Sequence, residues 1–285
     1  MAGRPKIAIV GAGKLGTALA ESLHAAGYRI SEVVSREASA SRRRARVLAR
    51  RVSARATTMR RPELTAEIVW FCVPDRAIAS QADALAKAHS AWRGKIAIHS
   101  SGALDSGELA ALRARGAATA SAHPLMTFVP GVRPSLAGVG FAVEGQSPAV
   151  RAARRLIAAL GGRAYPIDPR QKVLYHAWGT FASPLMIALL AVTEKVAAGS
   201  GVRRARARER MAPILRQTLE NYVRRGPAGA FSGPVIRGDV ETVRKHLRAL
   251  KGVPGAYEVY SALARAALDS LPVKNRKALM AELKG

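Results

Sequence analysis

A glycine-rich turn between an apolar segment and a helix pattern is the feature that most constrains the fold of this chain. The apolar segment Lys6–Val10 leads directly into Gly11-Ala12-Gly13-Lys14-Leu15-Gly16. In such a unit the first glycine allows a tight turn, the second lets the backbone approach a pyrophosphate, and the third lets helix and strand pack closely. The helix N-terminus adds free N–H groups and a positive dipole end. The sequence therefore predicts a dinucleotide-binding site at residues 11–16.

The next predicted strand, residues 29–34, indicates which dinucleotide is bound. It ends at Ser35 and Arg36, where NAD-binding domains usually carry Asp or Glu on the ribose 2′-hydroxyl. A hydroxyl and a planar guanidinium suit a 2′-phosphate instead. We therefore expect NADP(H) as the cofactor, with Ser35 and Arg36 on its 2′-phosphate. At least two of the three arginines at 42–44 are interpreted as the solvated face of the following helix.

Strand and helix patterns alternate through the first half of the chain and then give way to helices alone. Strands are expected at 6–10, 29–34, 67–73, 95–99, 117–122 and 139–143, and helices near 15–26, 38–51, 76–89, 105–114 and 148–160. This alternation is typical of a doubly wound, mostly parallel sheet. We therefore predict an α/β Rossmann domain over residues 1–166. An all-α C-terminal domain over 167–285 is expected to follow, with helices near 169–198, 203–224, 239–250, 254–269 and 275–284. Asp168 and Asp239 are expected to cap two of these helices.

The strong positive charge leaves a nucleic-acid partner open as a hypothesis. The formal net charge is +27, from 46 Lys and Arg against 19 Asp and Glu. The arginines are spread over several predicted helices, without the interleaved aromatic residues that stack on bases, so we favour anionic cofactors and carboxylates as the attracted ligands.

The remaining composition argues against a metal centre, a disulfide and a membrane anchor. The single cysteine, Cys72, allows no internal disulfide, and the six histidines show no metal-ligand spacing. No apolar run has the length of a membrane span, and no signal-peptide pattern precedes the first strand. A cytoplasmic protein is expected.

Three loops at predicted strand ends carry candidate site residues. Val73 and Pro74 follow the strand that contains Cys72 and are expected near the nicotinamide ribose. Ser100 and Ser101, beside a glycine, offer hydrogen-bond donors for a carboxylate or carboxamide. His123 precedes a proline at a strand end, and is interpreted either as a contact to substrate or nicotinamide or as a structural hydrogen-bonding residue.

Two further candidates lie in the helical half. Lys172, His176 and Ser183 fall on one face of the predicted helix. Lys172 is a candidate for the proton donor that accompanies hydride transfer, and extension into solvent is the alternative. Pro184 is expected to kink this helix. Arg237, in the glycine-rich segment 232–239, is the candidate for binding a substrate carboxylate.

Several segments together resemble the Rossmann-like oxidoreductases with a C-terminal helical domain of unknown function, which are related in fold to pyrroline-5-carboxylate reductase, ketopantoate reductase and the 6-phosphogluconate dehydrogenases. The resemblance implies an NADP-dependent oxidoreductase that forms a homodimer through its helical domain, and Lys172 and Arg237 match the family's helix lysine and loop arginine. Where relatives read Ala-Ser-Asn, this chain reads Ala182-Ser183-Pro184. The resemblance rests on the segments Lys6–Gly16, His99–Leu104, His123–Phe128, Lys172–Ser183, Thr218–Asn221 and Ser232–Asp239.

These observations lead to one principal hypothesis and two alternatives. The principal one is an NADPH-dependent reductase of a small carboxylate-bearing ketone or imine, with ketopantoate as the specific candidate and His123 and Arg237 placing the substrate. An imine reductase of the pyrroline-5-carboxylate type is the first alternative. The second is an NADP-binding sensor or partner-binding protein without turnover, an interpretation favoured by Pro184.

Overall fold

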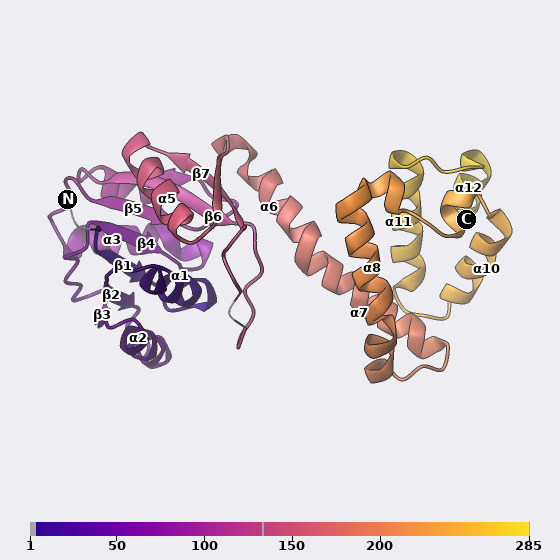
Figure 1. The fold of residues 1–285 in the computed structure, drawn as a ribbon, viewed down its shortest axis with the longest axis horizontal. Helices are drawn as coiled ribbons and strands as arrows, with labels where there is room; N and C mark the ends of the chain where they lie inside the picture. Colours follow the sequence, from indigo (N-terminus) through magenta and orange to yellow (C-terminus); the bar gives the residue numbers. More distant parts are fainter. Residues whose placement is uncertain (1–3, 133, 285) are drawn as a thin grey trace. The chain divides into compact units, whose positions relative to one another are not determined.

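The computed structural model describes residues 4–132 and 134–284, and the chain forms two compact units that divide between Phe181 and Ala182 (Figure 1). The first unit is built on one sheet of eight strands in the order β3-β2-β1-β4-β5-β6-β7-β8. All neighbouring strands pair in parallel except β6 and β7, which are antiparallel. The strands are β1 (Ile7–Val10), β2 (Ile30–Ser35), β3 (Arg55–Thr58), β4 (Ile68–Phe71), β5 (Ile96–His99), β6 (Ala118–Pro124), β7 (Gly140–Gly145) and β8 (Arg163–Pro166).

Helices cover both faces of this sheet, as the prediction of a doubly wound domain requires. Alternate residues of β1 enter two different cores: Ile7 and Ile9 pack in the core that includes residues of α1, α2 and α5, whereas Ala8 and Val10 pack in the core of α3 and α4. The period of two in a strand produces this division. The helices are α1 (Lys14–Ala25), α2 (Ser39–Arg51), α3 (Ile78–Ala88), α4 (Ala110–Arg113) and α5 (Ser147–Ala159).

Three elements of this unit differ from the sequence prediction. Strand β3 was not expected, because its four residues are half-exposed or exposed and provide no apolar run at the sheet edge. The expected helices at 76–89 and 105–114 begin with 3₁₀ turns, η1 (Asp75–Ala77) and η2 (Ser106–Leu109). Short 3₁₀ segments are frequent at helix starts and share most of the sequence signals of an α-helix.

The long helical stretch after β8 changes its hydrogen-bond spacing at Pro184. The Asp168 carboxylate caps its start, accepting from the backbone N–H of Arg170 at 2.9 Å. The stretch runs through η3 (Pro169–Gln171), α6 (Lys172–Thr180), the π-helical segment η4 (Phe181–Leu185) and α7 (Met186–Gly199). A π-helix bonds across five residues, so it bypasses the N–H that proline lacks. A π-helical turn thus takes the place of the expected simple kink.

The second unit consists of helices packed around a core that includes Val243, Leu247 and Leu268. It contains α7, α8 (Arg204–Ala230), α9 (Pro234–Arg237), α10 (Val240–Leu250), α11 (Ala256–Ser270) and α12 (Arg276–Glu282). Helix α8 is interrupted at Gly226, where φ is 68°, close to the predicted helix end at 224, and a short helical segment follows the break. The segment expected as a loop at 232–239 contains the short helix α9, because Gly233 and Gly238 take positive φ on either side of a proline-initiated turn.

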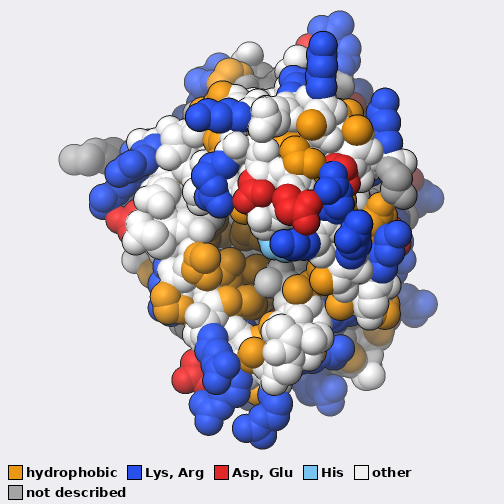
Figure 2. All heavy atoms as spheres, turned by 90° about the vertical axis from the view of Figure 1, so that its right-hand side faces the viewer, with side chains coloured by type: hydrophobic (Ala, Val, Ile, Leu, Met, Phe, Trp, Pro, Cys, Tyr) orange, Lys and Arg blue, Asp and Glu red, His pale blue; other side chains and the backbone are white. Residues whose placement is uncertain are grey.

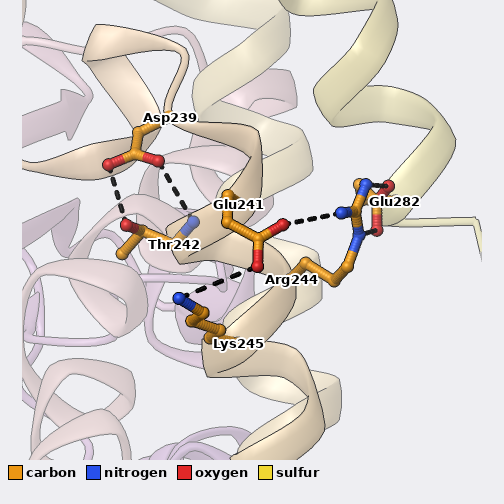
Figure 3. Close-up of polar contacts among 6 residues, drawn as sticks. All are labelled: Asp239, Glu241, Thr242, Arg244, Lys245 and Glu282. Carbon is orange, nitrogen blue, oxygen red and sulfur yellow. Dashed lines mark hydrogen bonds and ion pairs between the residues drawn. The ribbon is translucent and has the colours of Figure 1, made fainter.

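Polar contacts fix the start of α10 and link the helix to α12 (Figure 3). Asp239 caps the helix as predicted, its carboxylate accepting from Thr242 N at 3.1 Å and Thr242 Oγ1 at 2.8 Å. The Arg244 guanidinium forms ion pairs with Glu241 of the same helix and with Glu282 of α12, at 2.7 and 2.6 Å. The capping bonds satisfy helix-start donors, and the second ion pair links α10 to α12.

One stretch, Pro169–Gly199, is long and apolar enough to cross a membrane when judged by length and composition alone. The sequence pattern, by contrast, predicted no apolar run with the length of a membrane span. None of its most apolar window is buried within the chain. Large exposed apolar side chains, among them Leu174, Phe181 and Ile187, therefore lie along it without cover from the described residues.

Candidate functional site

The three glycines of the first turn have different steric surroundings. Gly11 has φ +101°, and a Cβ there would lie 2.6 Å from the Cys72 carbonyl oxygen. A Cβ at Gly16 would overlap the carbonyl oxygen of Gly11. At Gly13, by contrast, the nearest atom would be 4.0 Å away. Gly11 and Gly16 are therefore required by the protein itself, whereas Gly13 borders open space that a ligand can approach.

A cavity of about 880 Å³ lies beside this turn. Its charged lining residues are Lys14 of α1 and Arg44 and Arg51 of α2, and none of the described lining residues is acidic. No side chain within 4–132 and 134–284 caps the N-terminus of α1, so the first-turn N–H groups remain available to an anion. The other lining residues include Leu15, Val73, Pro74 and the loop 129–132. The cavity therefore has the size and charge for a large anionic ligand.

A second cavity, of about 180 Å³, lies where β2 ends and contains the residues predicted for the 2′-phosphate. Ser35 and Arg36 both line it, together with Gly11, Ala12 and Gly13. The Ser35 hydroxyl donates to Thr57 O over a long 3.4 Å. Arg36 is exposed. These residues lie around one cavity that continues from the glycine turn.

Arg44 lines both cavities and was not singled out by the sequence analysis. Ser41, three residues earlier on α2, shares the smaller cavity with it. Residues three apart lie on one helix face. The run of three arginines concealed this signal, because the sequence alone does not tell which of the three lines a cavity.

Lys172 is fully buried, so the alternative of extension into solvent is wrong. Its Nζ donates to the Ser101 carbonyl oxygen at 3.1 Å and to Ser121 Oγ at 2.8 Å. Burial lowers the pKa of Lys172, and the nearby carboxylates of Glu144, Asp105 and Asp75 oppose that shift. An ammonium has three N–H donors. The protonated amine therefore keeps one donor that no described residue accepts.

The serines predicted as ligand donors are engaged within the protein. Ser101 Oγ donates to Asp75 Oδ2 at 2.8 Å and accepts from the N–H groups of Ala103 and Leu104. Ser100 Oγ accepts from Trp70 Nε1 at 2.8 Å. Neither serine lines a cavity among those described above. In this arrangement their hydroxyls shape the loop after β5, and the Ser101 carbonyl holds Lys172.

His99, the last residue of β5, is a buried structural side chain. Its Nδ1 accepts from Ser101 N at 3.1 Å, and its Nε2 lies 2.8 Å from the Asp105 carbonyl oxygen. Burial is the main reason that the pKa of His99 falls to about 4. The neutral ring therefore carries its proton on Nε2 at neutral pH.

His123, at the end of β6, lies next to Tyr175 of α6. Its Nδ1 is 3.0 Å from Tyr175 Oη, and Tyr165 Oη of β8 donates to the same hydroxyl at 3.3 Å. Neither tyrosine was predicted as a site residue, although Tyr175 follows Lys172 by three residues on one helix face. A Cβ at Gly102 would lie 2.9 Å from His123 Nε2 and 2.6 Å from His176 Cδ2. Glycine at 102 therefore makes room for both imidazole rings.

Arg237 belongs to the second unit, where it ends α9 and is exposed. No ion pair or hydrogen bond of its guanidinium occurs within 4–132 and 134–284. Its planar group is thus available for a carboxylate ligand. No group of His, Cys, Asp and Glu side chains among the described residues could hold a metal ion.

Comparisons with known proteins match this architecture. Residues 1–124 match the model of a Rossmann-like domain, and residues 139–267 match that of DUF2520, a domain of unknown function. No curated protein matches. A Bacteroides fragilis protein assigned as an NADP oxidoreductase is 22% identical, with a TM-score of 0.76 over 92% of this chain and 97% of its own.

Two further solved structures share the fold at lower identity. A reductive aminase from Aspergillus terreus, in complex with NADPH, cyclohexanone and allyl amine, is 18% identical with a TM-score of 0.62, over 94% of each chain. A pyrroline-5-carboxylate reductase from Coxiella burnetii is 14% identical with a TM-score of 0.59, over 99% of this chain and 97% of its own. At these identities the likeness concerns the fold.

Proposed function

Because this chain joins a Rossmann-like domain to a DUF2520 domain, we propose that it is an NADP(H)-dependent oxidoreductase acting on a small carboxylate-bearing ketone or imine. The observation that carries the proposal is the open approach to Gly13 beside a cavity lined by cations. The reductive aminase of the same fold, which was crystallised with NADPH, supports the choice of cofactor.

The residues present fit an NADP molecule. The backbone of Gly11–Gly16 and the start of α1 would bind the pyrophosphate. Ser35, Arg36 and Arg44 would bind the 2′-phosphate in the smaller cavity, which all three of them line. Val73 and Pro74 form part of the wall of the larger cavity. When bound, NADPH supplies the hydride.

The chemistry of the chain's own residues concerns protons and carboxylates. Lys172 would donate the proton that a reduced carbonyl requires, and its lowered pKa brings proton release closer to neutral pH. Arg237 would bind the substrate carboxylate through its free guanidinium. His123 would help to place the substrate. Ketopantoate remains the specific candidate, with a cyclic imine such as a pyrroline carboxylate as the second.

The first experiment is NADPH binding followed by turnover of a panel of 2-oxo acids and cyclic imines. We expect NADPH fluorescence to change on binding, NADPH to bind more tightly than NADH, and at least one compound of the panel to oxidise it. Absence of binding by either reduced nicotinamide would sink the proposal. Tighter binding of NADH would overturn only the assignment of Ser35, Arg36 and Arg44.

Replacement of Lys172 distinguishes the two substrate classes. A ketone needs a proton during reduction, so Lys172→Ala should lower kcat by about 10²–10⁴-fold. A protonated imine needs no acid in the hydride step, and its reduction should be nearly unaffected. Equal turnover of a ketone by the variant and the wild type would rule out Lys172 as the acid. Circular dichroism checks that the variant is folded.

A second candidate function is NADP binding without turnover, as in a sensor or a partner-binding protein. Pro184 favours it, since the resemblance places an asparagine amide there. The π-helical turn around Pro184 lacks that amide. Tight NADPH binding with no oxidation by the panel would support this function.

The proposal includes a homodimer in the cytoplasm. Its support is the set of large apolar side chains exposed on α6, α7 and α8, which an aqueous monomer would leave in contact with water. An apolar groove of about 370 Å³, lined by residues of α7, α10 and α11, adds to this surface in the second unit. Figure 2 shows hydrophobic side chains lining a hollow with Lys and Arg around it. A second copy of the chain is the occupant we propose.

A further inference from the structure

A chain of hydroxyl groups leads from Tyr165 through Tyr175 to His123. The Tyr165 hydroxyl donates to Tyr175 Oη at 3.3 Å. Tyr175 has one hydroxyl proton and two acceptors within reach, His123 Nδ1 at 3.0 Å and the His123 carbonyl oxygen at 3.4 Å. The shorter contact is the stronger hydrogen bond. Burial raises the pKa of the Tyr175 phenol, which therefore keeps its proton, and His123 Nδ1 is the nearer of its two acceptors.

The imidazole of His123 is neutral under the same conditions. Burial is the largest cause that lowers the pKa of His123 to about 4, and the nearby His176 and Lys172 lower it further. A neutral imidazole has one N–H donor and one acceptor nitrogen. When Nδ1 accepts from the nearer Tyr175 hydroxyl, the ring proton is on Nε2.

The Nε2 atom faces the space left by the absent side chain of Gly102. A Cβ at that position would lie 2.9 Å from Nε2. Among residues 4–132 and 134–284, no group accepts a hydrogen bond from Nε2, and Nε2 is not among the buried unsatisfied atoms. His99 is different, because Ser101 N and Asp105 O occupy both of its ring nitrogens. Of these two histidines, only His123 has a ring nitrogen without a hydrogen-bond partner among the described residues.

We propose that Tyr165 and Tyr175 are positioning residues that hold His123 as its Nε2–H tautomer, so that this N–H donates to the carbonyl oxygen of a ketone substrate. The second part rests on the proposed function. A neutral donor stabilises the negative charge that develops on a carbonyl oxygen during reduction. An iminium nitrogen has no lone pair to accept the same hydrogen bond. The arrangement therefore selects a ketone over a protonated imine.

The tautomer can be tested without any ligand, by nitrogen NMR of protein labelled with ¹⁵N-histidine at neutral pH. We expect a pyridine-type signal for His123 Nδ1 and a pyrrole-type signal for its Nε2. In Tyr175→Phe the two signals should move toward each other as both tautomers become populated, and Tyr165→Phe should give a smaller shift in the same direction. His99, whose partners are backbone groups, is the internal control and should not change. A protonated Nδ1 in the wild type, or an unchanged His123 in Tyr175→Phe, overturns the proposal.

Two amide replacements test the donor itself against the 2-oxo acid that the panel identifies. The side-chain N–H₂ of Gln reaches the place of Nε2, whereas that of Asn reaches only the place of Nδ1. We expect His123→Asn to lower kcat by about 10²–10³-fold, as loss of one transition-state donor does, and His123→Gln to recover at least tenfold of that loss. The KM for NADPH should be unchanged in both.

The outcomes separate this inference from the proposed function. Equal kcat in the Gln and Asn variants, or a panel in which only cyclic imines are reduced, overturns the role of Nε2–H as a donor to a ketone. Failure of NADPH to bind would overturn the proposed function, while the NMR result would still decide the tautomer.

Discussion

At the residue scale, two glycines of the first turn have different roles: Gly16 is needed for folding, and Gly13 for ligand binding. Gly16 packs against the Gly11 carbonyl and tolerates no Cβ, whereas Gly13 faces open space. We expect Gly16→Ala to destabilise the protein by about 1–3 kcal/mol through overpacking. Gly13→Val should leave the unfolding free energy nearly unchanged but weaken NADPH binding by at least tenfold, because its side chain occupies the approach to the backbone.

Urea unfolding and NADPH titration of the two glycine variants check this prediction. Gly13→Ala, with the smaller side chain, is the matched control and should weaken binding less than Gly13→Val. Normal NADPH affinity in Gly13→Val would contradict the placement of the pyrophosphate.

A second residue-scale prediction concerns pH and His99. Its pKa is about 4 in the folded protein and 6.5 in the unfolded chain, because burial disfavours the charged ring. Between these values the unfolded chain binds a proton that the folded protein does not, so stability falls as pH drops from 6.5 to 4. Between pH 6.5 and pH 4, His99 lowers the free energy of unfolding by about 3 kcal/mol.

Urea unfolding between pH 7 and 4.5, followed by the fluorescence of the buried Trp70 and Trp92, measures this dependence. His99→Gln should be less stable at pH 7 but show a shallower decline on acidification. An identical decline in the variant and the wild type would show that His99 is not the responsible group.

At the element scale, the π-helical turn η4 is the departure from regular structure that most concerns function. It contains Pro184, and the two compact units divide within it. Pro184→Asn restores a backbone N–H and introduces the amide that the resemblance places there. We expect NADPH affinity within twofold of the wild type and turnover raised by about tenfold, the value of one added hydrogen bond to the reacting substrate.

Pro184→Ala serves as the control for this change, because it restores the N–H without an amide. Steady-state kinetics of both variants with the same panel compound make the comparison. If the Ala variant gains as much as the Asn variant, the helix geometry and not the amide limits turnover.

At the scale of the whole molecule, the exposed apolar surface of α6 to α8 leads to a prediction about assembly. Phe181 is 72% exposed and Val223 is 80% exposed. We expect sedimentation velocity to give twice the mass of one chain at micromolar concentration. The double change Ile214→Glu and Val223→Glu on α8 should shift this toward the monomer, because charged side chains are costly to bury.

Val47→Glu is the control for assembly, since Val47 is a comparably apolar exposed residue on α2 of the first unit. It should leave the mass of the assembly unchanged. A wild-type protein that sediments as a monomer would overturn the proposed dimer, and co-sedimentation with lipid vesicles would favour membrane contact by Pro169–Gly199 instead.

The sequence by itself determined the parts of this protein that depend on local periodicity and local backbone geometry. The strand pattern at Lys6–Val10 and the spacing of Gly11, Gly13 and Gly16 predicted the turn, and the alternation of strand and helix patterns over residues 6–160 predicted the doubly wound sheet. The caps at Asp168 and Asp239 were equally readable, because a capping side chain bonds to its own next turn. Such features need only neighbours within a few positions along the chain.

Only the tertiary structure decided which side chains meet from distant elements. The contacts of Lys172 with Ser101 and Ser121 span 71 and 51 residues, and His123 meets Tyr175 across 52. No periodicity encodes such a pairing, because it depends on the order of β5, β6 and β8 in the sheet. The same packing engages the Ser101 hydroxyl with Asp75 and makes Arg44 a lining residue of both cavities. Neither result follows from local sequence, because burial and close approach depend on how the sheet and helices pack together.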